Sequence, residues 1–107
     1  MSLPLKWEFP GGKVELGESP DLALLREIRE ELNILVQIVS PLSPTIHEYD
    51  TDKKIRLIPY LCTILDSQIP SPTEHAQTIW KEMDTLLELD WAEADLPIVF
   101  EIMKYHL

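Results

Sequence analysis

Three glutamates stand at spacings that could bring their carboxylates together. Glu27 is followed by Glu30 and Glu31, and on a helix that turns by about 100° per residue these positions fall in one arc beside the apolar stripe. Such like charges repel one another by roughly 0.2–0.5 kcal/mol per pair. Hard cations such as Mg²⁺ or Mn²⁺ take carboxylate oxygens, so the cluster is a candidate metal site. The helix alone favours the plainer interpretation of a solvated acidic face.

The segment that carries these glutamates has the start, the stripe and the stop of a helix. Ser19 is a good N-cap and Pro20 suits the first helical position. The apolar residues that recur at helical spacing are Leu24, Leu25, Ile28 and Leu32. We therefore predict a helix from residue 20 to Asn33, with this stripe in the core and with Ala23 leaving the acidic arc open to a ligand.

The rest of the chain alternates β-rich stretches with helical ones. The predicted elements are a loop at 10–12, an extended piece at 13–17, strands at 34–39, 45–49, 55–65 and 78–80, a turn at 51–54, and helical pieces at 84–89 and 96–106. Pro59 cannot donate a ladder hydrogen bond, so its strand should lie at an edge or carry a bulge. Without repeats or linkers, the prediction is one domain over residues 1–107, of α/β or α+β class with a mixed sheet.

The charge of the chain excludes several classes of partner. The 107 residues carry a formal net charge of −10, so nucleic-acid polymers and anionic membranes would repel the protein, and a phosphate ligand would need a divalent cation. The single cysteine, Cys62, has no partner for an internal disulfide and indicates a reducing compartment. No apolar stretch approaches the ~20 residues that span a bilayer, so the expected location is the cytoplasm.

The loop before the helix gives more weight to the metal site. From Gly12 the chain reads Gly, five residues, Glu18, seven residues, Arg26-Glu27, and on to Ile34. This segment, residues 12–34, resembles the signature of the Nudix hydrolase family, G-x5-E-x7-R-E-U-x-E-E-x-G-U, where U is aliphatic. The one specified position that differs is Asn33, where the family has Gly, and Asn is the usual substitute at a left-handed helix end. Segments 7–13, 74–80 and 94–97 resemble the MutT-like subgroup.

This resemblance implies a Nudix-type mixed β-sheet flanked by helices, with a divalent cation, Mg²⁺ or Mn²⁺, in the loop and helix. The metal ligands that it implies are the carbonyl of Gly11 and the carboxylates of Glu27, Glu30 and Glu31. Arg26 and Glu18 would support these carboxylates rather than contact substrate. The catalytic base would be Glu30, Glu31 or Glu74, and Glu74 could equally be an ordinary loop acid.

Three further residues are candidates for substrate binding. Phe9 fits the subgroup's apolar wall against a base, with plain core packing as an even alternative. Lys13 could reach a phosphate oxygen or could be a solvated strand residue. Asp95 could accept hydrogen bonds from a guanine or cytosine edge, and its role as N-cap of the last helix is at least as well supported. His75 is assigned to the surface.

The activity that the resemblance implies is hydrolysis of nucleoside triphosphates to the monophosphate and pyrophosphate. We expect oxidised-guanine or CTP-like substrates and a role in sanitising the nucleotide pool. The chain begins almost inside the signature, so we expect an N-terminally truncated fold with an unpaired strand. A second copy of the chain could pair with this strand and form a homodimer. The alternative is a truncated remnant that binds nucleotide or metal without efficient turnover. An acidic interaction domain would explain the charge but not the register from Gly12 to Glu31.

Overall fold

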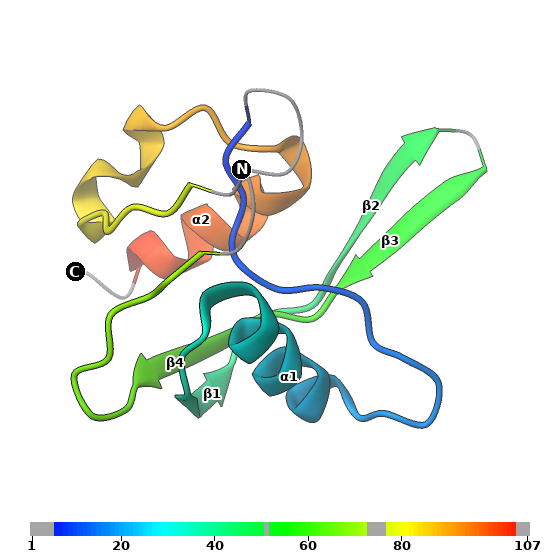
Figure 1. Ribbon diagram of the computed structural model, residues 1–107. Coiled ribbons are helices and arrows are strands. Elements are labelled where there is room, and N and C mark those ends of the chain that lie inside the picture. The colour runs from blue at the N-terminus through cyan, green and yellow to red at the C-terminus, as the bar shows by residue number, and fades with distance from the viewer. Residues whose placement is uncertain (1–5, 51, 73–76, 105–107) are drawn as a thin grey trace. The chain divides into compact units, whose positions relative to one another are not determined.

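The computed structural model (Figure 1) describes residues 6–50, 52–72 and 77–104. These residues fall into two units, each packed mainly within itself. The α1 unit comprises residues 9–40, 60–72 and 77–79, and the hairpin unit comprises 6–8, 41–50, 52–59 and 80–104. Glu74 and His75, part of the predicted turn and the end of the predicted last helix lie outside the described residues.

The α1 unit is built on the predicted helix, α1, which runs from Pro20 to Leu32. The carbonyl of Ser19 accepts the first helical hydrogen bond from Ala23 at 2.9 Å, and the proline occupies the first turn. The helix ends at Asn33, whose φ of 56° and ψ of 40° are left-handed. The backbone N–H of Asn33 donates to the Arg29 carbonyl at 2.9 Å. Both predicted helix boundaries are therefore confirmed.

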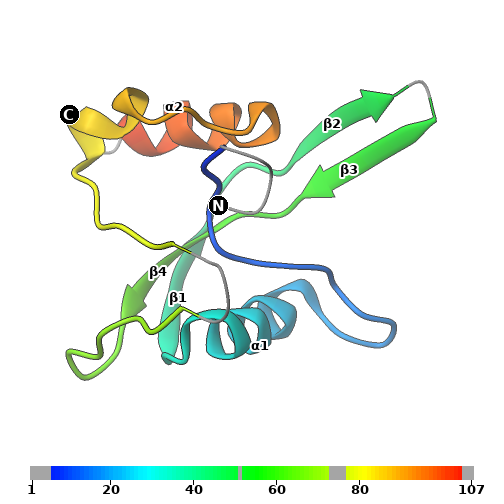
Figure 2. The same ribbon diagram turned by 45° about the horizontal axis from the view of Figure 1, so that its top comes forward.

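A two-stranded sheet packs beside α1. β1 (Val36–Pro41) pairs with β4 (Tyr60–Ile64), and both lie alongside α1 in two views (Figures 1 and 2). Hydrogen bonds from Leu65 to Leu35 at 3.2 Å and from Leu42 to Pro59 at 2.9 Å flank the ladder, so the strands are antiparallel. The buried core of this unit consists of Ile28, Leu32 and Ile34, with Leu24, Val36 and Ile64 packed against it. Full burial of an aliphatic side chain of this size contributes about 1.5–3 kcal/mol.

The acidic arc of α1 is covered in one part and exposed in another. Ala23 is 2% exposed, so this position is buried rather than open, whereas the Glu30 side chain is 61% exposed. The loop before the helix lies against this turn, because a Cβ at Gly11 would stand 3.9 Å from Leu24 Cδ1. The carboxylates of the arc thus face a backbone loop rather than open solvent alone.

The hairpin unit contains β2 (Thr45–Asp50) and β3 (Lys53–Leu57), an antiparallel pair with a bulge between Glu48 and Asp50. The strand predicted at 55–65 is interrupted: β3 ends at Leu57, and β4 begins after Pro59 in the other sheet. Proline lacks the N–H that a continuous ladder needs, so the predicted irregularity becomes a complete break. In the described part of the chain, the strand predicted at 78–80 is irregular.

The C-terminal part of the hairpin unit is helical. Two 3₁₀ helices, η1 (Met83–Glu88) and η2 (Glu93–Asp95), precede α2 (Leu96–Lys104). Val99 of α2 is fully buried, and the Trp91 indole donates to the Leu86 carbonyl at 2.7 Å. Trp7 forms a parallel bridge with Trp91, so antiparallel and parallel pairing both occur. No helix in the described part of the chain has the length and apolar character needed to cross a membrane.

Candidate metal centre

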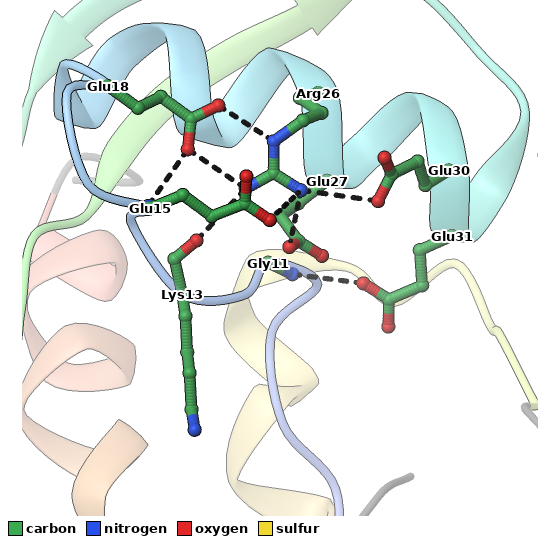
Figure 3. A network of polar contacts seen from close by, with 8 residues as sticks. All are labelled: Gly11, Lys13, Glu15, Glu18, Arg26, Glu27, Glu30 and Glu31. Atoms are coloured by element: carbon green, nitrogen blue, oxygen red, sulfur yellow. Dashed lines mark hydrogen bonds and ion pairs between the residues drawn. The ribbon is translucent and has the colours of Figure 1, made fainter.

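Arg26 is the centre of a network of carboxylates on α1 and the preceding loop (Figure 3). One edge of its guanidinium holds Glu18 in a two-point contact, Nε to Oε2 at 2.7 Å and Nη2 to Oε1 at 2.9 Å. Nη2 also donates to the Lys13 carbonyl at 3.0 Å. Bidentate pairs of this kind are short and directional, so Arg26 fastens the loop to the helix.

The same contact shifts the protonation of both partners. Hydrogen bonding from Arg26, followed by the backbone N–H of Glu15, lowers the pKa of Glu18 to about 2. Hydrogen bonds to Glu18 and then Glu27 raise the pKa of Arg26 above its usual range. Both groups are therefore charged throughout the physiological pH range.

The other terminal nitrogen of Arg26 faces the predicted metal ligands. Nη1 donates to Glu27 Oε1 at 2.9 Å and to Glu30 Oε2 at 3.2 Å, and Glu15 Oε1 stands 3.7 Å from it. The Glu27 side chain is 23% exposed, whereas those of Glu30 and Glu15 are 61% and 69% exposed. Arg26 thus offsets the repulsion that the carboxylates would otherwise feel.

The two glycines of the loop allow the backbone to approach these carboxylates. Gly11, with φ of +154°, donates its N–H to Glu31 Oε2 at 3.3 Å. A Cβ added at Gly12 would overlap the Glu27 carboxylate carbon and both of its oxygens. A side chain at position 12 is therefore incompatible with the observed place of Glu27.

The loop closes in a turn before α1. The backbone N–H of Glu15 donates to Glu18 Oε1 at 3.0 Å, and the N–H of Glu18 returns to the Glu15 carbonyl at 3.0 Å. Gly17 supplies the left-handed φ of +81° that the turn requires. Glu18 is therefore held by both the turn and Arg26.

The donor set fits a hard divalent cation in its chemistry, since carboxylate oxygens approach one loop backbone. As the side chains stand, the described residues include no group of three His, Cys, Asp or Glu placed to share one ion. The cause is visible in Figure 3: Glu27 and Glu30 turn toward Arg26, and Glu31 turns toward Gly11. Convergence on an ion requires side-chain rotation within the same loop and helix.

The structure brings some predicted residues together and leaves others apart. Those gathered in one network are Gly11, Glu18, Arg26, Glu27, Glu30 and Glu31. Lys13 contributes its carbonyl, while its side chain extends away from the carboxylates (Figure 3). Phe9 is half-buried in the α1 unit. Asp95 is 9% exposed in the hairpin unit and is the last residue of η2, which runs directly into α2, so its predicted role as N-cap of the last helix is wrong.

Sequence reasoning missed Glu15. This residue lies in the unspecified spacer between Gly12 and Glu18, so no motif singled it out. Its position three residues before Glu18 is the spacing of a closed turn, which was the available signal. Its carboxylate joins those around Arg26.

Comparison with known proteins gives a consistent set of similarities. Residues 2–102 match the family model described as the NUDIX domain. The chain is 31% identical over 99 residues to an 8-oxo-dGTP diphosphatase from Escherichia coli K12, covering 92% of this chain and 75% of that protein. It is 31% identical to a CTP pyrophosphohydrolase from the same organism, covering 91% and 70%.

A solved structure is similar in both sequence and fold. The solution structure of the DNA mismatch repair protein MutT from methicillin-resistant Staphylococcus aureus 252, described as a Nudix hydrolase, has 47% identity and a TM-score of 0.76. The match covers 98% of this chain and 79% of that one. Among the curated relatives, the matched segment spans between 39% and 75% of the relative's length.

Proposed function

The chain belongs to the NUDIX domain family and is MutT-like, and from this premise we propose that it hydrolyses nucleoside triphosphates to nucleoside monophosphates and pyrophosphate. The observation that carries the proposal is the Arg26 network, which holds Glu27 and Glu30 on α1. The preceding loop approaches Glu27 at Gly12, which has no side chain to fill the space. The continuous family match over residues 2–102 supports treating the two units as one NUDIX domain spanning residues 1–107.

The cation that we propose is Mg²⁺ or Mn²⁺. Its ligands would be the carboxylates of Glu27, Glu30 and Glu31 and the carbonyl of Gly11, all oxygen donors as such cations prefer. When bound, it would acidify a water molecule and stabilise charge on the leaving group. The net charge of −10 makes such a cation necessary, because the bare protein would repel a triphosphate.

The chain's own residues would position the reaction and move its proton. Glu30 or Glu31 would accept the proton of the attacking water, and Glu74 is a further candidate for this role. Arg26 would act as a positioning residue that holds Glu27 and Glu30 beside the loop before the cation binds. Glu18 would in turn hold Arg26, as its two-point contact supports.

For the nucleoside part of the substrate we propose a wall at Phe9 and a base contact at Asp95. An ionised Asp accepts hydrogen bonds and donates none, so it suits the amine and imino edges of guanine and cytosine. The named activities of two relatives, on 8-oxo-dGTP and on CTP, agree with these two bases. Lys13 would bind a phosphate oxygen only after its side chain turned toward the carboxylates.

We place the protein in the cytoplasm, where it would limit or sanitise a nucleotide pool without binding nucleic-acid polymers or membranes. Self-association is the further partner that we propose. In the described chain, β2 and β3 pair only with each other, so their outer edges could pair with a second copy. Light scattering should show association that strengthens with salt, because salt screens the repulsion between acidic copies.

Pyrophosphate release tests the proposal. Canonical and oxidised nucleoside triphosphates would be incubated with the protein in millimolar Mg²⁺, millimolar Mn²⁺ or chelator, and thermal melts would be recorded in the same buffers. We expect release that requires the cation and an upward shift of the unfolding midpoint with cation alone, since binding to the folded state stabilises it. A cation-induced shift without any release would instead support a chain that binds without efficient turnover.

A further inference from the structure

The donors of Arg26 are fully used in the network around it. Nε and Nη2 contact Glu18 and the Lys13 carbonyl, and Nη1 contacts Glu27 and Glu30. These contacts account for every N–H that a guanidinium carries. A cation that took the Glu27 and Glu30 oxygens now bonded to Nη1 would therefore compete with Arg26 for its acceptors.

We propose that Glu15 is a positioning residue that accepts the Nη1 donors of Arg26 when a divalent cation takes Glu27 and Glu30, an inference that rests on the proposed metal centre. Glu15 Oε1 is already 3.7 Å from Nη1. A rotation of one exposed side chain brings that distance into hydrogen-bond range. Arg26 then releases two carboxylates to the cation and keeps Glu15 as a charged partner. We call this exchange of partners the hand-over.

The hand-over requires only a few side chains to move. Arg26 stays in place because Glu18 and the Lys13 carbonyl hold its other edge at 2.7–3.0 Å. The backbone of Glu15 is also fixed, since its N–H and its carbonyl both bond to Glu18. Its side chain is 69% exposed and is free of steric confinement on its solvent side. Only the Glu15 carboxylate and the two released carboxylates need to move.

The same contacts explain why Glu15 should contribute little before the cation binds. At 3.7 Å and largely exposed, its interaction with Arg26 is a weak surface ion pair. The hand-over shortens that contact, so Glu15 stabilises the cation-bound state more than the free state. The contribution of Glu15 should therefore be measured as a change in cation affinity, not as a change in the stability of the free protein.

Calorimetric titration of the nucleotide-free protein with Mn²⁺ tests the inference. Glu15→Gln should weaken binding by about two- to fivefold, the range of an exposed ion pair, and should move the unfolding midpoint in chelator by less than about 4 °C. Glu15→Asp keeps the charge but draws the carboxylate back by one methylene, so it should weaken binding as well. Glu93→Gln, an exposed acid of the hairpin unit, controls for net charge and should leave the affinity unchanged.

A double-mutant cycle with Arg26→Gln separates this contact from the general field of the lost charge. If Glu15 acts through Arg26, Glu15→Gln changes Mn²⁺ affinity by less than about twofold in the Arg26→Gln background, because coupled residues are non-additive. Equal weakening in both backgrounds together with wild-type affinity for Glu15→Asp would overturn the hand-over. Failure of the wild-type chain to bind Mn²⁺ would instead overturn the metal centre itself.

Discussion

Replacing Gly12 with alanine should separate metal binding from folding. The added Cβ would overlap the carboxylate of Glu27, which is the mobile end of a flexible side chain, so Glu27 would swing away rather than the backbone shift. The displaced carboxylate would lose its 2.9 Å contact with Arg26 and its place against the loop. We expect a protein that folds but binds Mg²⁺ or Mn²⁺ poorly.

The expected stability change follows from the contact that is lost. The Arg26 and Glu27 side chains are 25% and 23% exposed, and a partly screened pair of this kind contributes at most about 1 kcal/mol. Lower backbone entropy of the unfolded alanine variant offsets about 0.4–1 kcal/mol where its backbone conformation is compatible. The unfolding midpoint should therefore fall by less than about 5 °C, while cation affinity falls at least about tenfold.

Gly17→Ala is the matched control. Gly17 has a left-handed φ of +81° and open space around its missing Cβ, so alanine there should cost about 1–2 kcal/mol of backbone strain. The unfolding midpoint should drop by several degrees with cation affinity unchanged within about twofold. Calorimetry and thermal melts on both variants give the comparison. Wild-type cation affinity in Gly12→Ala would refute the close approach of the loop to Glu27.

Substitutions at four other residues test the rest of the site and the end of its helix. Glu30→Gln and Glu31→Gln should each lower turnover by orders of magnitude with an unchanged melt, because an anionic ligand is lost, and full activity in both would contradict their assignment. Asn33→Gly should be as stable as wild type in urea, whereas Asn33→Ala should lose about 1 kcal/mol at the left-handed position; equal stability of the two variants would count against that conformation. Glu18→Gln should destabilise the protein at neutral pH, with the difference from wild type shrinking as pH falls from 4.5 toward about 2, because the lowered pKa of Glu18 makes its contribution disappear on protonation. A difference that stayed constant over that range in acid denaturation would exclude this role.

Local signals were sufficient to predict α1. Ser19, Pro20 and Asn33 mark its ends through the conformations that they favour, and these preferences need no distant contact. The carboxylates on its surface follow from helical spacing in the same way. The contacts that hold Glu18 against Arg26 also link residues close in sequence, so they could be anticipated from the motif.

Features that depend on distant partners were not predictable in this way. The apolar run from Ile55 to Leu65 reads as one strand, yet its halves pair with different strands, and only tertiary pairing decides where it divides. The outward direction of the Lys13 side chain (Figure 3) and the approach of Glu15 to Arg26 depend on how the loop folds back. No residue-type preference determines how the loop folds back onto α1.

The identity of the phosphorus-containing products tests the central claim most directly. The protein would be incubated with a nucleoside triphosphate and Mg²⁺ in ¹⁸O-labelled water, and the products would be followed by ³¹P nuclear magnetic resonance. A MutT-like pyrophosphohydrolase predicts nucleoside monophosphate and pyrophosphate in equal amounts, with no product when chelator replaces Mg²⁺. Release of inorganic phosphate with nucleoside diphosphate, or equal turnover in chelator, would contradict the account.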